Sequence, residues 1–244
     1  MKYSILSIFL CFCTLEFFGQ DDSLHALDHQ EHIDLVEYTF NSNRIINLQS
    51  IRNTPRGVLD FRISHRFGYL NSGIDNFFGL DQASMRLGLE YGLTDGLMIG
   101  IGRSSFRKAI DVFAKLKIAR QQEGQSPFPI SISLFHSTVV ETLAFENPDR
   151  DNYFSSRLFY TWQILLARKF SDGFSFQLSP GVVHRNLVEK SDENNDILSL
   201  GMGARVKLSH RISLNAEYIL AAQSGLADEF ENSASIGFDI KTSG

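Results

Sequence analysis

Alternation of apolar and polar residues through one short stretch after another constrains the fold of this chain most. Between residues 84 and 92, for example, Met85, Leu87, Leu89 and Tyr91 alternate with Ser, Arg, Gly and Glu. A period of two places every apolar side chain on one face of a β-strand, whereas a helix would spread them around its surface. The chain is therefore expected to be all-β.

The alternating pattern predicts ten strands, which the connections join in a regular way. We expect the strands at 57–67, 83–93, 97–103, 109–119, 129–138, 156–169, 174–182, 198–208, 212–220 and 233–240. Short connections alternate with long polar loops along the chain. The short ones are tight turns at 94–96, 171–173 and 209–211 and a slightly longer connection at 120–128, and the long loops are 68–82, 139–155, 185–197 and 221–232. The short 104–108 connection is the exception on the long-loop rim. Tight turns on one rim and long loops on the other predict an antiparallel up-and-down transmembrane β-barrel of the outer membrane, with the tight turns in the periplasm.

Alternation alone does not say which face of the strands meets water. A soluble β-barrel buries its apolar face, whereas a membrane barrel turns that face toward lipid. Three features favour a membrane barrel over a soluble one. They are the length of the strands, the abundance of charge and glycine on the polar faces, and the alternation of tight turns and long loops between the two rims. A soluble periplasmic β-barrel that binds a ligand stays as an alternative.

The N-terminus predicts export. Lys2 precedes an apolar run from Ser4 to Leu15, which is typical of a secretory signal peptide over residues 1–20. Phe17 departs from the pattern, because a small residue is expected three positions before a cut after Gly19. We expect residues 21–43 to form an N-terminal periplasmic arm and residues 44–244 to form the barrel domain. Both cysteines, Cys11 and Cys13, lie in the signal peptide, so the mature chain needs neither a disulfide nor a thiolate metal site.

Charged residues on the polar faces are the candidate functional residues. The net charge of −5 does not indicate nucleic-acid binding, which is typical of chains with an excess of positive charge. We expect the following charges to face the lumen: Asp60, Arg62, Arg66, Arg86, Glu90, Lys115, Lys117, Arg157, Arg205 and Glu217. They would line a narrow, weakly anion-selective pore or form a salt-bridged plug, and the plug is favoured because a small barrel leaves little free lumen.

Two further constellations carry weaker hypotheses. His25, His29 and His32, with Asp28 and Glu31, could share a helix face and hold a metal, but a solvated arm explains them better, and we expect no cofactor.

An enzyme acting on outer-leaflet lipid would need a Ser–His pair. Such a pair could come from His136 and Ser137, or from His184, with Glu141 or Glu189 as the acidic partner. Adjacent residues of a strand point to opposite faces, and no nucleophile-elbow motif is present, so we expect no enzymatic activity. The expected partners are outer-membrane lipids and the barrel-assembly machinery, and a small polar solute stays open.

Ten segments of the chain carry a resemblance to known proteins, and they lie at 44–47, 57–68, 70–73, 78–82, 86–92, 102–106, 152–157, 177–180, 184–186 and 213–218. Together they resemble a Gram-negative bacterial family of membrane-bound β-barrel proteins of unknown function. The resemblance runs from about residue 35 to the end and implies a barrel without implying an activity. Relatives usually continue past residues 241–244 into more strands, which leaves open a C-terminal truncation of a barrel of about twelve strands.

Overall fold

The computed structural model describes residues 33–36, 39–68, 73–81, 83–124, 126–145, 151–188, 193–221 and 232–242. They all belong to the compact unit Ile33–Gly244. The expected signal peptide, the first part of the expected arm and the histidine cluster at 25–32 lie outside the described residues.

All ten expected strands are present, and most of their ends lie within one or two residues of the expected positions. The strands are β2 (Leu59–Arg66), β3 (Ser84–Gly92), β4 (Leu97–Ser104), β5 (Ile110–Ala119), β7 (Ser131–Val140), β8 (Leu158–Lys169), β9 (Phe174–Arg185), β10 (Asp196–Lys207), β11 (Ile212–Ala221) and β12 (Ser233–Ile240). The all-β expectation is confirmed.

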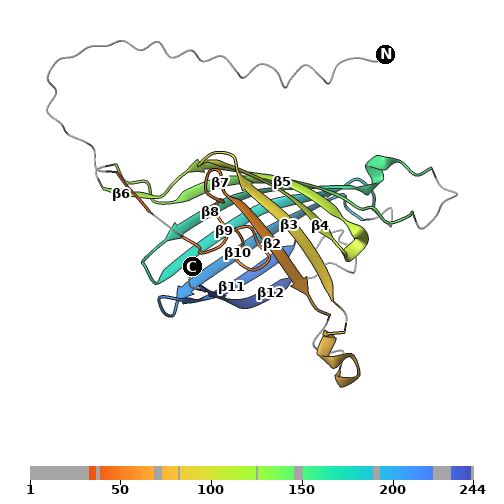
Figure 1. The fold of residues 1–244 in the computed structure, drawn as a ribbon. Helices are drawn as coiled ribbons and strands as arrows, with labels where there is room; N and C mark the ends of the chain where they lie inside the picture. The colour runs from red at the N-terminus through yellow and green to blue at the C-terminus, as the bar shows by residue number, and fades with distance from the viewer. Residues whose placement is uncertain are drawn as a thin grey trace, which may run out of the picture. The chain divides into compact units, whose positions relative to one another are not determined.

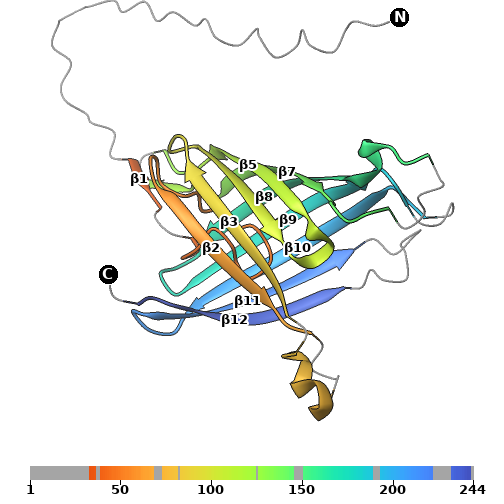
Figure 2. The ribbon, with the colours of Figure 1, turned by 45° about the vertical axis from the view of Figure 1, so that its right-hand side comes forward.

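These strands form one antiparallel sheet in which neighbours in sequence are neighbours in space (Figure 1). The sheet runs from β2 to β12 in chain order and curls around the segment that precedes β2 (Figure 2). In the described part of the chain, β2 pairs with β3 alone and β12 with β11 alone. Among the described residues, the two edge strands are therefore not hydrogen-bonded to each other.

The three tight turns share one stabilising device. In each, a hydroxyl near the start of the turn accepts hydrogen bonds from the backbone N–H groups two and three residues on. The hydroxyls belong to Thr94, Ser171 and Ser209. Such local acceptors satisfy backbone groups that the turn removes from the ladder. At the second turn, Lys169 donates a hydrogen bond to Asp172, which holds the pKa of that carboxyl below its usual value.

Two short strands were not expected from the sequence. β1 (Ile33–Leu35) pairs antiparallel with β6 (Gln122–Gly124), which lies in the connection between β5 and β7. The backbone N–H of Val36 also bonds the carbonyl of Gln121 at 3.0 Å. Three residues are too few to show an alternating pattern. Their pairing brings the N-terminal part of the described chain to the tight-turn rim.

The opposite rim carries the longer connections. Among the described residues they contain the 3-10 turns η2 (Ile74–Gly79), η3 (Phe106–Lys108) and η4 (Phe154–Arg157). No helix in the described residues is long and apolar enough to cross a membrane.

The sheet is apolar outside and polar inside. On β2, for example, Leu59, Phe61 and Ile63 are all more than half exposed. By contrast, Glu90 and Lys115 on the inner face have no exposed surface at all. A protein stable in water shows the reverse arrangement, since apolar area is expelled from water. This inside-out pattern is the arrangement expected of a chain whose outer face meets lipid.

Candidate functional site

Residues 39–54 fill the space that the sheet encloses. The segment folds back on itself: the N–H of Ile45 bonds the carbonyl of Leu48 at 2.9 Å, and the N–H of Ser50 bonds the carbonyl of Asn43 at 3.0 Å. We call residues 39–54 the lumen hairpin. It appears in red to orange within the curl of the sheet in Figure 2. The structure thus places residues 39–43, which we expected in a periplasmic arm, inside the domain with residues 44–54.

The lumen hairpin carries the hydrophobic core of the domain. Its Phe40, Ile45, Leu48 and Ile51 are buried, and they form one cluster with five side chains of the sheet: Met98, Phe113, Phe135, Leu165 and Ala167. These five occupy inward positions of their strands, where polar residues prevail. Because apolar side chains gain about 1.5–3 kcal/mol each when fully buried, the cluster gives residues 39–54 a reason to stay inside rather than in water. This explains why the arm prediction was wrong for residues 39–43.

The tip of the lumen hairpin closes around one carboxylate. Glu217 on β11 accepts hydrogen bonds from the backbone N–H groups of Ile46 (3.1 Å), Asn47 (2.9 Å) and Leu48 (3.0 Å). The Asn47 side-chain amide donates a further bond at 2.8 Å. A carboxylate buried with four donors is satisfied without an arginine or lysine partner.

Asn47 also lies between the two edge strands. Its Oδ1 accepts from Arg66 on β2 at 3.4 Å, and its Nδ2 lies 3.3 Å from Ser235 Oγ on β12. One side chain of the hairpin tip therefore contacts both ends of the sheet, which are not paired with each other.

The returning arm of the hairpin is held by Lys115 and Gln177. The Lys115 ammonium donates to the carbonyls of Ser50 (2.9 Å) and Arg52 (2.5 Å). Gln177 on β9 accepts from the N–H of Ile51 at 2.8 Å and donates to the carbonyl of Gln49 at 2.7 Å. These are backbone groups of a non-strand segment inside the sheet, and a buried backbone group is costly if left unpaired.

Glu90 on β3 organises the other side of the lumen. Asn43 donates to it at 3.0 Å, Arg44 lies 3.4 Å away, and the Arg62 Nε lies 3.8 Å away. Arg62 in turn contacts Asp60 at 3.5 Å. Both arginines and the fully buried Glu90 therefore form one network that includes the hairpin.

The remaining expected lumen charges do not join this network. Arg86 pairs with Asp111 through two bonds of 2.8 and 2.5 Å along the inner wall. Lys117 donates to the Asp95 carbonyl in a tight turn at 3.2 Å, and Arg205 donates to Ser213 at 3.2 Å. Arg157 lies apart from all of these. It ends η4 at the long-loop rim, where it bonds the carbonyl of Glu141 and stacks on the Phe145 ring.

Inward-facing glycines make room for the hairpin. A Cβ added at Gly201 would lie 2.8 Å from Leu48 Cδ2, and one added at Gly203 would overlap Ile45 Cδ1. The hairpin and the wall therefore fit each other side chain by side chain. Sequence reasoning noted the glycines on the polar faces but not what they accommodate. The apolar exceptions on those faces, Phe113, Phe135 and Leu165, were the signal that could have revealed a packed interior.

The hypothetical Ser–His pair is not assembled. Ser137 is buried on the inner face, whereas His136 contacts Trp162 at 4.8 Å between ring centroids, on the outer face. His184 bonds Asp196 at 2.7 Å, and Glu141 bonds Arg107 at 3.1 Å. Glu189 lies outside the described residues. Within the described ranges, no group of three or more His, Cys, Asp or Glu residues could hold a metal ion.

The sequence from residue 40 to residue 244 matches the model of a family described as a membrane bound beta barrel domain (DUF5777). The chain belongs to this family. The resemblance and the barrel fold expected from the sequence are thereby confirmed, and the domain is a membrane-bound β-barrel. The exposed apolar face of the sheet is the face that such a domain presents to lipid.

The other comparisons add little to the family assignment. A solved structure described as the NanC porin is similar, with 11% sequence identity and a TM-score of 0.44, over 76% of this chain and 100% of that one. No curated protein matches this sequence.

Proposed function

We propose that this chain is an outer-membrane β-barrel without enzymatic activity, which its own lumen hairpin keeps closed and which serves as a structural or binding platform. The observation that carries this proposal is the occupation of the lumen by residues 39–54. In this proposal the chain is exported through a cleaved signal peptide. Its partners are outer-membrane lipids and the barrel-assembly machinery.

The anchoring of the hairpin favours a closed barrel over an open pore. Side chains from six strands bond it: Arg66 on β2, Glu90 on β3, Lys115 on β5, Gln177 on β9, Glu217 on β11 and Ser235 on β12. Its apolar residues are packed against the inner wall. A path for solute would require breaking charge-assisted hydrogen bonds inside the barrel, each worth about 1.5–3 kcal/mol.

The outer surface supports the membrane part of the proposal. Backbone polar groups in the sheet are paired across strands, which is how a strand can cross hydrocarbon without exposing them. Most of the large outward side chains on β2 to β5 are leucine, isoleucine, valine, phenylalanine, methionine or tyrosine, and many are exposed, whereas His65 and Arg103 lie near the long-loop ends of their strands. A contiguous exposed apolar surface of this kind would aggregate in water.

Planar-bilayer recording of the folded, full-length protein tests the closed state. We expect no single-channel steps from samples whose folding is shown by heat-modifiable gel migration. Regular steps from unmodified protein would overturn the platform in favour of the narrow pore. Recovery of folded protein from the periplasm without detergent would overturn the membrane location itself.

The absence of enzymatic activity is tested separately. Alanine at His136 or at His184 removes the histidines that a lipid-acting enzyme would need. We expect cells carrying either variant to show the lipid profile of cells with the unchanged protein. A lipid species that accumulates only with the variants would overturn the non-enzymatic proposal.

A further inference from the structure

Outward side chains at paired positions form a row across neighbouring strands of the sheet. The strand registers align Tyr91, Ile99, Ala114, His136, Trp162 and Val182 on successive strands from β3 to β9. Ala114 is the smallest member of the row, and His136, beside it, is the only imidazole. Within this row the smallest side chain therefore lies beside the imidazole.

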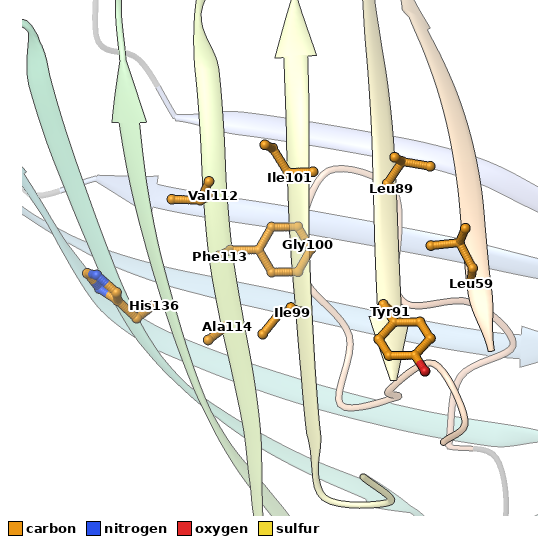
Figure 3. A pocket seen from close by; sticks show the side chains of 10 residues that line it. All are labelled: Leu59, Leu89, Tyr91, Ile99, Gly100, Ile101, Val112, Phe113, Ala114 and His136. Carbon is orange, nitrogen blue, oxygen red and sulfur yellow. The ribbon is translucent and has the colours of Figure 1, made fainter. Parts of the chain in front are cut away.

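Two apolar hollows flank this place. One, with a volume of about 480 Å³, is lined mainly by apolar residues of β2 to β5 (Figure 3). The other, of about 580 Å³, lies over β5 to β10 and includes Trp162 and Val182. Ala114 and His136 line both. In Figure 3 the Phe113 ring lies at Gly100, and His136 marks the far border of the first hollow.

The imidazole of His136 is out of place on a lipid-facing surface. Its Nδ1 lies 3.1 Å from the carbonyl oxygen of Thr161 and must donate to it, because that oxygen is only an acceptor. Its Nε2 lies 3.3 Å from the hydroxyl of Thr138. Ionisable groups are expensive against hydrocarbon, and where they occur they mark functional sites.

Polar aromatic side chains connect His136 to the long-loop rim. Ring centroids are 4.8 Å apart for His136 and Trp162, 5.8 Å for Trp162 and Tyr160, and 6.2 Å for Tyr160 and His184. His184 then bonds Asp196, the first residue of β10, at 2.7 Å. The track thus begins between the hollows and ends at a pair of groups that can donate to and accept from a ligand.

We propose that this outer face is a specific binding site for one membrane lipid with two acyl chains and a phosphate-bearing headgroup. The chains fill the two hollows on either side of Ala114 and His136, and the headgroup lies at the rim against the imidazole of His184, whose Nδ1 is held by Asp196. This inference rests on the proposed function, because it requires the outer face to lie in a membrane.

The amphipathic layout selects this ligand class. Side chains that line a void lose dispersion contacts unless a flexible chain fills the void. The hollows are almost wholly apolar, which suits acyl chains, whereas the imidazole of His184 suits a phosphate oxygen. A lipid supplies both parts on one molecule and in this order from the interior to the rim.

Trp162 gives a direct probe, since it is the only tryptophan of the chain and lies in the second hollow. The full-length protein is reconstituted in vesicles of digalactosyldiacylglycerol, and phosphatidylglycerol with brominated acyl chains is added stepwise. Bromine quenches tryptophan on contact. The reverse titration adds brominated digalactosyldiacylglycerol to vesicles of phosphatidylglycerol. We expect brominated phosphatidylglycerol to reach half-maximal quenching at a several-fold lower lipid fraction than brominated digalactosyldiacylglycerol does in the reverse titration.

Two variants separate the parts of the site. Ala114→Leu fills the floor shared by both hollows and should abolish the preference for the phosphate lipid. The matched control is Ala216→Leu, because Ala216 is an exposed outward alanine on β11, away from the hollows, and this change should leave the preference intact. His184→Ala should remove the preference but leave Trp162 accessible to brominated chains.

The possible failures are distinguishable. Quenching that follows bulk composition equally for both lipids overturns the site and leaves the membrane barrel standing. The site is also overturned if Ala114→Leu and Ala216→Leu behave alike. If the protein does not enter vesicles at all, both this inference and the proposed function fail.

Discussion

Glu217, in the middle of β11, and Asn47, at the tip of the lumen hairpin, are 170 positions apart and are joined through both the backbone N–H and the side-chain amide of Asn47. The same carboxylate accepts the N–H groups of Ile46 and Leu48. One buried side chain thereby holds a turn that has no strand partner of its own.

Replacing Glu217 with alanine should release the hairpin tip. Three backbone N–H groups would lose a charged acceptor, which should lower the free energy of unfolding by about 2–4 kcal/mol. Guanidinium denaturation of the protein in detergent micelles measures the change, and bilayer recording should show intermittent steps that the unchanged protein lacks. Asp239→Asn is the control, since Asp239 lies on the next strand and faces Ser213 rather than the hairpin tip. Equal stability of the two variants would contradict the role of Glu217.

Gly203→Val should displace the hairpin by steric conflict. The new side chain would overlap Ile45, and overpacking of this kind costs about 1–3 kcal/mol. Hydrogen exchange of residues 43–50 should become faster while exchange of the strands changes little. At Gly237 an added Cβ meets Ile46 only at 3.5 Å, so Gly237→Val serves as the tolerated counterpart. Unchanged exchange in Gly203→Val would mean that hairpin and wall are not closely packed.

The inner-wall pair of Arg86 and Asp111 should behave as a unit. Asp111→Ala leaves a largely buried guanidinium without its carboxylate and should destabilise the protein by about 3 kcal/mol. The double variant Arg86→Met with Asp111→Ala should cost less than the sum of the two single variants, because no unpaired charge remains. A double-mutant cycle in denaturant measures the coupling. Additive effects would show that the pair contributes little.

Arginine at Ile101 distinguishes lipid from water on the outer face. Ile101 lies in the centre of β4 and is about half exposed, so in water Ile101→Arg would be nearly neutral. In a bilayer the same change should cost about 2–4 kcal/mol, whereas Leu208→Arg, just beyond the end of β10, should cost about 0–1 kcal/mol. Unfolding of both variants in lipid vesicles gives the comparison. Equal, small effects would argue against a membrane-embedded face.

Much of this architecture follows from short-range pattern. Ten strands were predicted because a period of two shows within each strand, without knowledge of its partners. The tight turns were also local, since Thr94, Ser171 and Ser209 bond their own turns. The inward direction of Glu90, Lys115 and Glu217 follows from the same alternation. Their partners do not, because a charge on a strand face carries no information about which distant segment satisfies it.

The lumen hairpin shows where the sequence stops being informative. Residues 39–54 have neither a helical nor an alternating period, so local pattern places residues 39–43 in an arm and gives residues 44–54, at the start of the barrel domain, no element. The sequence by itself determined which residues form strands and which face of each strand is apolar, because both depend on the stereochemistry of neighbouring residues. Only the tertiary structure decided what fills the barrel, because the burial of Phe40, Ile45 and Leu48 and the bonds to Glu217 arise only after the sheet has brought its walls together.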